Sequence, residues 1–229
     1  MKHENVKAII LKRTNFQEAD RIITLLTETK GKVRVMAKGV RKQKSKLAGG
    51  LELLSVSDIS YIISKSEIYT VMSTRLVEHY SEIVKDIDKT MAAYKVLGNI
   101  NKLCEDHSGQ EFFEDLIIFL QYLNDKGSNV NQALLWHGLR LLSTTGHAPN
   151  LMTDSTGVNL VAGKNYSFNI EAMSFTYSTS RNFNEKHIKL LRILTSSLTP
   201  ETNLYENVGE FVSKNLRLVE QLCKYHLNI

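Results

Sequence analysis

The stretch RIITLLTETKGKVRVMA, residues 21–37, shows how this chain begins to fold. Residues 21–27 and 32–37 are short runs rich in β-branched side chains, which favour strands, and a polar turn containing Gly31 separates them. Glycine adopts positive φ angles without a steric penalty, so Gly31 can reverse the chain between neighbouring strands. The stretch therefore predicts two strands joined by a tight turn.

Three similar runs surround this pair, at residues 6–11, 53–63 and 68–77. Five strands within the first 80 residues are typical of a small barrel. Their spacing, with a longer polar connection at residues 39–50, suits an OB-type barrel with Greek-key connections. An SH3-like barrel has similar spacings, and hydrophobic periodicity does not distinguish the two.

From about residue 79 the hydrophobic period changes from two to about 3.6 residues, which predicts helices. The first runs to about residue 105, with one apolar face formed by Ile83, Ile87, Met91, Tyr94, Leu97 and Ile100. Further helices are predicted at about residues 112–123, from Asn131 as a possible N-cap to residue 145, and at 184–198 and 204–227. The polar segment 152–180 predicts a loop with one short hairpin.

The predicted fold class is therefore α+β: a five-stranded OB-type β-barrel followed by an all-helical domain with a short hairpin or loop insertion. We place the boundary after residue 78, which gives a barrel domain at 1–78 and a helical domain at 79–229. No apolar run approaches the roughly 20 residues that cross a bilayer, and the first residues do not resemble a secretory signal. We therefore expect a cytoplasmic protein.

The net charge of +5 is unevenly distributed along the chain. Residues 1–50 contain thirteen Lys or Arg and only four Asp or Glu, a balance of +9, so the remainder carries −4. Such an asymmetry indicates a polyanionic partner, either nucleic acid or an anionic membrane surface. The charge is most concentrated in KGVRKQKSK, residues 38–46, which has five cations and no acidic residue. A charge run alone is commonly just a solvated surface.

The residues around this run follow a recognisable pattern. The turn FQEADR (16–21) is followed by Leu26-Thr27, Gly31-Lys32, AKGVR (37–41) and Ser45. This order and spacing resemble the N-terminal domain of the RecO family of bacterial recombination mediators. The sequence GHAPNL, residues 146–151, also resembles the family's Gly-aromatic-x-Pro-x-Leu step at a helix end, so the resemblance extends over essentially the whole chain.

The resemblance implies a function in recombinational DNA repair, without enzymatic activity. Proteins of this family bind single- and double-stranded DNA and anneal complementary strands. They help to load RecA onto strands coated by single-strand-binding protein, act together with RecR, and often work in the RecF pathway. The implied location is the nucleoid within the cytoplasm.

One feature of the family is missing from this chain. Many members carry two CxxC pairs after the Gly-aromatic-x-Pro-x-Leu step, and these form a tetrahedral zinc site. No cysteine occurs at residues 152–180, and Cys104 and Cys223 have no such spacing. We therefore expect no zinc and no other cofactor. Residues 152–182 should replace the zinc-finger segment with a hairpin packed by Tyr166, Phe168, Phe175 and Tyr177.

Backbone phosphates are the natural ligands of the cations near the N-terminus. We predict that the DNA-binding residues are Lys38, Arg41, Lys42, Lys44 and Lys46, with Arg21, Lys32 and Arg34 on neighbouring strands as additions. Phosphate contacts give affinity without reading base sequence. OB barrels often add aromatic side chains on which bases stack, and Phe16, Tyr61 and Tyr69 are the candidates, although each is more commonly a core or surface aromatic.

A partner site is also predicted in the helical region. Trp136, Leu139 and Leu142 lie on one helical face beside Arg140. Core packing is the ordinary explanation of such a face. The alternative is a groove for the acidic, apolar C-terminal tail of single-strand-binding protein, a partner that the resemblance implies, with Trp136 and Arg140 as contacts.

Two functions of other classes remain open from the residues alone. OB barrels with basic loops also bind structured RNA, so an RNA-binding or translation-associated factor is an alternative. A nuclease or nucleotidyltransferase would need clustered carboxylates for a metal, and Glu18 and Asp20 are the nearest pair in the basic region. The seven histidines are scattered and show no metal-binding spacing.

Overall fold

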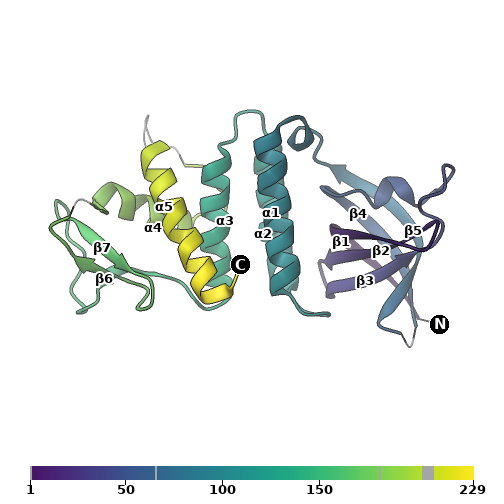
Figure 1. The fold of residues 1–229 in the computed structure, drawn as a ribbon, viewed down its shortest axis with the longest axis horizontal. Coiled ribbons are helices and arrows are strands. Elements are labelled where there is room, and N and C mark those ends of the chain that lie inside the picture. Colours follow the sequence, from purple (N-terminus) through teal and green to yellow (C-terminus); the bar gives the residue numbers. More distant parts are fainter. Residues whose placement is uncertain (1, 65, 181, 203–208) are drawn as a thin grey trace. The chain divides into compact units, whose positions relative to one another are not determined.

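The computed structural model describes residues 2–64, 66–180, 182–202 and 209–229. The chain forms two compact units, Met1–Lys126 and Gly127–Ile229. The first contains the strands β1 to β5 and the helices α1 and α2; the second contains the strands β6 to β8 and the helices α3 to α5 (Figure 1). None of the helices in the described ranges has the length and apolar character needed to span a membrane.

The five predicted strands near the N-terminus are present and close into a barrel. They are β1 (Lys2–Phe16), β2 (Asp20–Thr27), β3 (Gly31–Ala37), β4 (Ser55–Ile63) and β5 (Ile68–His79), in the order β1-β2-β3-β5-β4. The long strand β1 pairs with β4 through its first half and with β2 through its second half. A short parallel pairing of β3 with β5 completes the closure. This is the OB-type arrangement, so the structure resolves the alternative left by the spacing.

Alternating side chains fill the barrel. In β3 every second residue is buried, from Gly31 to Ala37, as the period of two requires. The same alternation in the other strands brings a single apolar cluster together; its most buried members are Ala8, Ile10, Ile23, Leu25, Val33, Val35, Ala37, Leu51, Ile59 and Tyr61. Gly31 has a φ of +63°, which confirms its predicted role in the turn.

Two helices complete the first unit, α1 (Ile87–Leu103) and α2 (Phe113–Asn124). Asp86 caps α1 by accepting hydrogen bonds from the backbone N–H groups of Asp88 and Lys89. The predicted apolar face of α1 is wrong in part, since Ile87 is 73% exposed and Met91 is 61% exposed.

The face of α1 that is buried consists of Lys89, Ala92, Ala93, Val96, Leu97 and Ile100. Alanine side chains allow close approach of neighbouring elements, and the Lys89 ammonium is satisfied by the carbonyl of Asp125. A hydrophobicity pattern does not anticipate either feature. The predicted domain boundary after residue 78 coincides with the end of β5, whereas the compact unit continues through α2. The division into two domains after residue 78 therefore stays a prediction.

Within its described residues, the second unit has three α-helices and a small sheet. Its helices are α3 (Val130–Thr144), α4 (Glu185–Ser196) and α5 (Gly209–Leu222), and α5 continues into a π-helical turn, Cys223–Leu227. Asn129 caps α3 instead of the predicted Asn131. Residues 204–208 of the last predicted helix lie outside the described residues.

The predicted hairpin in the segment without cysteines is formed by β7 (Tyr166–Asn169) and β8 (Ser174–Tyr177). A further short strand, β6 (Asn150–Asp154), adds to β8 and extends the hairpin to a three-stranded sheet. Aromatic rings pack this segment edge to face, and the ring centroids of Phe168 and Phe175 are 4.8 Å apart. An aromatic cluster therefore occupies the segment that the resemblance predicts to replace a zinc site.

Candidate nucleic-acid interface

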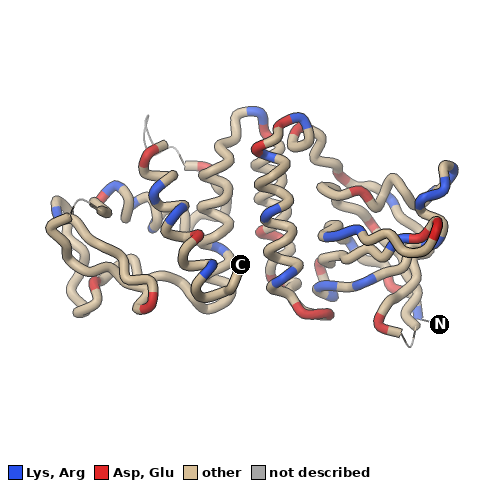
Figure 2. The backbone as a smooth tube through the Cα atoms, in the orientation of Figure 1, with Lys and Arg blue, Asp and Glu red and all other residues tan. Residues whose placement is uncertain are grey.

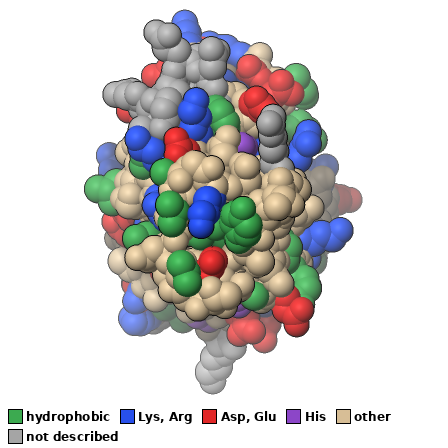
Figure 3. Space-filling view, turned by 90° about the vertical axis from the view of Figure 1, so that its left-hand side faces the viewer, with side chains coloured by type: hydrophobic (Ala, Val, Ile, Leu, Met, Phe, Trp, Pro, Cys, Tyr) green, Lys and Arg blue, Asp and Glu red, His purple; other side chains and the backbone are tan. Residues whose placement is uncertain are grey.

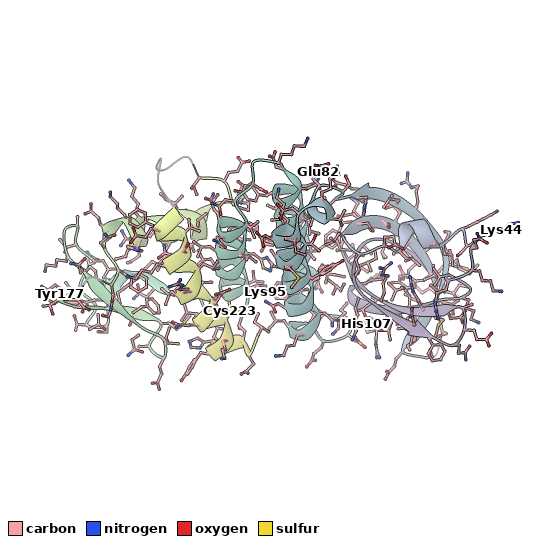
Figure 4. The ribbon with its side chains drawn as sticks, turned by 45° about the horizontal axis from the view of Figure 1, so that its top comes forward. Lys44, Glu82, Lys95, His107, Tyr177 and Cys223 are labelled. Atoms are coloured by element: carbon pink, nitrogen blue, oxygen red, sulfur yellow. The ribbon has the colours of Figure 1, made fainter. Side chains whose placement is uncertain are left out.

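The basic run forms a loop at one end of the barrel. Residues 38–46, here called the basic loop, follow β3, and the side chains that carry its charge are exposed: Lys38, Arg41, Lys42, Lys44 and Lys46. Figure 2 shows the run of blue where this loop extends beyond the strands. Lys44 points away from the barrel (Figure 4). The structure thus brings the five main predicted residues together on one loop.

Apolar residues hold the two ends of the basic loop against the barrel. Val40 is buried in the apolar cluster of the barrel, and Leu47, just after the loop, packs partly against it. The Thr74 hydroxyl of β5 donates to the Leu47 carbonyl at 3.1 Å. The cations between these points are therefore carried on a segment whose ends are fixed.

Polar contacts join the basic loop to the turn between β1 and β2. The Gly39 N–H donates to Oδ1 of Asp20 at 2.7 Å, and the Arg41 N–H donates to the Ala19 carbonyl at 2.9 Å. The Arg41 guanidinium also donates to the Gln17 carbonyl at 3.4 Å. Two of the segments that carry the family resemblance, residues 16–21 and 37–41, are thus neighbours in the fold.

Arg21 belongs to the same end of the barrel. It pairs with Ala37, the residue just before the basic loop, and its Nε donates to Oδ1 of Asn15 at 3.0 Å. Phe16, which pairs with Asp20, is 40% exposed. An arginine and an exposed aromatic ring therefore accompany the five cations of the basic loop.

Lys32 and Arg34 lie at a different place. The Lys32 ammonium donates to the carbonyls of Asn101, at 3.1 Å, and Cys104, at the C-terminal end of α1, where a positive charge also interacts favourably with the helix dipole. The Arg34 guanidinium lies 2.7 Å from Asp106 and 3.0 Å from Glu67, and these carboxylates raise the pKa of Arg34.

Both side chains face outward from β3, as the alternation of a strand requires, and residues 106–108 pair with the backbone edge of β3 at Lys32. As DNA contacts Lys32 and Arg34 stay predictions. The structure gives their charged groups protein partners.

The three candidate stacking residues have different environments. Tyr61 is 1% exposed, and burial raises its pKa to about 12. Tyr69 stacks on it with ring centroids 5.4 Å apart, and its hydroxyl lies 3.4 Å from Nε2 of His107, which Figure 4 labels. Of the three, Phe16 is the one that is exposed beside the basic loop.

The predicted partner contact at Trp136 stays a prediction, and the structure shows this side chain buried. Trp136, Leu139 and Leu142 are fully buried, and the indole N–H of Trp136 donates to the Ser197 carbonyl at 3.1 Å. These residues lie in the core of the second unit, which fits core packing, the ordinary explanation of such a face. Arg140 is partly buried on the same helix.

The second unit does have a hollow of mixed character on its surface. A groove of about 580 Å³ lies between residues 160–162 and α4. Its apolar lining includes Leu160, Val161 and Ile188, and its cations are Lys186, Lys189 and Arg192. Figure 3 shows apolar and positively charged side chains side by side on the end of this unit. Sequence reasoning missed the groove, because the segment that lines one side of it has no regular period.

Two side chains that line this groove, Glu185 and Arg192, make hydrogen bonds to neighbouring backbone. Glu185 also lines it, and its Oε2 accepts a hydrogen bond from the Gly163 N–H at 3.1 Å, which ties the loop to the start of α4. The Nε of Arg192 donates to the Leu151 carbonyl at 2.8 Å, which fixes the orientation of the guanidinium.

Of the two carboxylates considered for an enzyme, Asp20 has another use in the fold. Asp20 accepts the hydrogen bond from Gly39, and Glu18 is exposed on the turn. Among the residues that the structure describes, no group of three or more His, Cys, Asp or Glu side chains could hold a metal ion. Cys104 and Cys223 are buried, and burial raises the pKa of Cys104 to about 11.

Comparisons with a family model and with individual proteins point to the same family. Residues 1–80 match the family described as Recombination protein O N terminal. A protein of Acetivibrio thermocellus named DNA repair protein RecO is 31% identical over 150 residues, which cover 65% of this chain and 59% of that protein.

Proteins of the same name from Dehalococcoides mccartyi (strain CBDB1) and Heliobacterium modesticaldum are similar to this chain in the same way. The first is 35% identical over 63% of this chain and 57% of its own length. The second is 31% identical over 66% of this chain and 54% of its own length. The aligned part of this chain therefore spans between half and three fifths of these relatives.

Proposed function

This chain belongs to the RecO family of DNA repair proteins, and from that premise we propose that it is a DNA-binding recombination mediator. The observation that carries the proposal is the group of exposed cations on the basic loop, within the region that matches the family. The proposed ligands of these cations are the phosphates of single- and double-stranded DNA. Binding of this kind does not depend on base identity.

The proposed mechanism is electrostatic. Two complementary strands repel each other through their phosphates, and cations placed between them reduce this repulsion. The basic loop would in this way allow two strands to approach and pair. An anchored loop suits this task, because less conformational entropy is lost when the strand binds. Competition between RNA and single-stranded DNA distinguishes this proposal from the alternative of an RNA-binding factor.

The first experiment measures single-stranded DNA binding at several salt concentrations. If about five phosphates are neutralised, the slope of log affinity against log salt should be near −3.5, which removes roughly two decades of affinity between 50 and 200 mM salt. Changing Arg41, Lys42, Lys44 and Lys46 together to alanine should weaken binding and flatten this slope. An unchanged slope in that variant would show that the basic loop does not contact phosphates.

A matched control uses lysines at the other end of the barrel. Lys30 lies in the turn between β2 and β3, and the carbonyl of Lys7 accepts a hydrogen bond from the N–H of Glu28 in that turn. The double variant Lys7→Ala and Lys30→Ala removes the same charge as Lys44→Ala with Lys46→Ala. We expect only the second pair to weaken DNA binding several-fold. Equal losses would mean that net charge, and not this loop, determines affinity.

The family resemblance also supports protein partners: RecR, single-strand-binding protein, and a functional link to RecA and RecF. For the acidic, apolar tail of single-strand-binding protein, the groove beside α4 replaces Trp136 as our proposed site. Its cations suit carboxylates, and its aliphatic lining suits an apolar side chain.

The tail site is tested by binding of a labelled tail peptide. Lys189→Glu in the groove should weaken peptide binding at least several-fold and leave DNA binding by the basic loop unchanged. Arg140→Ala serves as the comparison, since Arg140 is on α3. A loss with Arg140→Ala and none with Lys189→Glu would place the site at α3 instead of the groove.

A further inference from the structure

The basic loop and the turn between β1 and β2 are held together by three hydrogen bonds. Two of them use only backbone acceptors, the carbonyls of Ala19 and Gln17, so they do not depend on the identity of those side chains. The third uses the carboxylate of Asp20, which accepts from the Gly39 N–H at 2.7 Å. Asp20 is thus the one side chain among these acceptors.

The hydrogen bond from Gly39 to Asp20 lies where the basic loop begins. Gly39 has a φ of +65° and begins a turn in which the Lys42 N–H donates to the Gly39 carbonyl at 3.1 Å. The charged side chains of Arg41 and Lys42 follow directly. By accepting from the Gly39 N–H, Asp20 fixes the start of the segment from which these cations project.

We propose that Asp20, although it is an anion beside a polyanion-binding surface, strengthens nucleic-acid binding by holding the basic loop in its binding conformation. This inference rests on the proposed function of the loop. Five cations on one short loop repel one another, and a loop released from its anchor has more conformations to lose when a strand binds. Asp20 acts through the loop and is a positioning residue.

The proposed effect of Asp20 on DNA affinity is opposite to the effect that its charge alone predicts. Charge alone predicts that removal of any acidic residue near a phosphate site tightens binding. Positioning predicts that removal of the Asp20 acceptor weakens it. Asp20→Ala removes both the charge and the acceptor. Asp20→Asn removes the charge and retains an oxygen that can accept from Gly39, so the two variants separate the effects.

The nearest acidic neighbour provides a charge control. Glu18 is exposed on the same turn, and the three hydrogen bonds described above do not use its side chain. Glu18→Ala changes the net charge by the same amount as Asp20→Ala. It should leave binding unchanged or make it slightly tighter, because the anchor of the basic loop remains.

The experiment measures affinity for labelled single-stranded DNA at fixed salt for the full chain and these three variants. We expect Asp20→Ala to bind about threefold to tenfold more weakly than the unmodified chain, and Asp20→Asn to bind at least as tightly. Hydrogen exchange of the Gly39 and Arg41 amides should be faster in Asp20→Ala alone. Binding by Asp20→Ala that is as tight as that of the unmodified chain would overturn the inference.

Two further outcomes are distinguishable. If the unmodified chain binds DNA without salt dependence, the proposed function of the basic loop fails first. If Asp20→Ala does not fold, Asp20→Glu tests the same point, since it keeps the charge and shifts the carboxylate by one methylene. Weaker binding by Asp20→Glu supports positioning, and unchanged binding contradicts it.

Discussion

At the scale of single residues, Gly31 meets two independent requirements. Its φ of +63° lies in the left-handed region, where other residues are strained. A Cβ at this position would also lie 2.2 Å from the backbone carbonyl oxygen of Ser108. The turn was predictable from the sequence, because polar residues with one glycine separate two strands. The approach of Ser108, 77 residues later in the chain, had no local signal.

Gly31→Ala should therefore be more destabilising than a glycine substitution in an open turn. We expect a loss of about 2–4 kcal/mol in the free energy of unfolding, from backbone strain together with displacement of residues near Ser108. Gly157→Ala is the matched control, since Gly157 has a φ of +85° and no neighbouring atom within 4 Å of the added Cβ. It should lose only about 1–2 kcal/mol. Urea unfolding measures both, and equal losses would mean that the contact with Ser108 is easily relieved.

At the scale of elements, strands were predicted more completely than helix faces. The barrel strands follow the period of two, and burial in β3 alternates without exception. In α1 the pattern of Ile87 and Met91 indicated a buried stripe, but the helix buries its alanines instead. The hydrophobic periodicity of the sequence shows that a helix has an apolar and a polar face. The shape of the neighbouring elements decides which residues are buried.

Two buried histidines make the helices of the second unit sensitive to pH. Burial lowers the pKa of His137 in α3 to about 3, and burial followed by the charge of Lys214 lowers that of His187 in α4 to about 4. The folded form thus keeps both rings neutral, whereas the unfolded chain takes up protons below the ordinary pKa of 6.5. Stability should fall as pH decreases from 6.5 towards 4.

Each histidine should remove about 1–2 kcal/mol of stability between pH 7 and pH 5. His187→Gln removes one titrating group, and glutamine can still reach back to the N-cap as His187 does in the capping box with Asn184. Urea unfolding at both pH values should show a smaller decrease for His187→Gln than for the unmodified chain. His79→Gln, at an exposed position, should leave the decrease unchanged. The same decrease in all three proteins would refute the role of His187.

At the scale of the whole molecule, the sequence showed how the charge is distributed along the chain. It did not show which contacts the individual cations make. The excess of cations in residues 1–50 indicated a polyanion site, and the basic loop displays five of these cations together. Lys32 and Arg34 belong to the same excess, but they bind the carbonyls at the end of α1 and two carboxylates. The sequence does not show which of these cations have protein partners, because that depends on contacts between distant residues.

The contact between β3 and the segment after α1 also has a consequence for synthesis of the protein on the ribosome. The Lys32 N–H donates to the Ser108 carbonyl at 2.8 Å, and the His107 N–H donates to the Lys32 carbonyl at 2.7 Å. A nascent chain can pair β1 with β2 early, yet β3 acquires these partners only after residue 108 has left the exit tunnel. Until then the backbone N–H and C=O of Lys32 are unpaired at this edge of β3, so the edge stays open to a nascent-chain chaperone during synthesis.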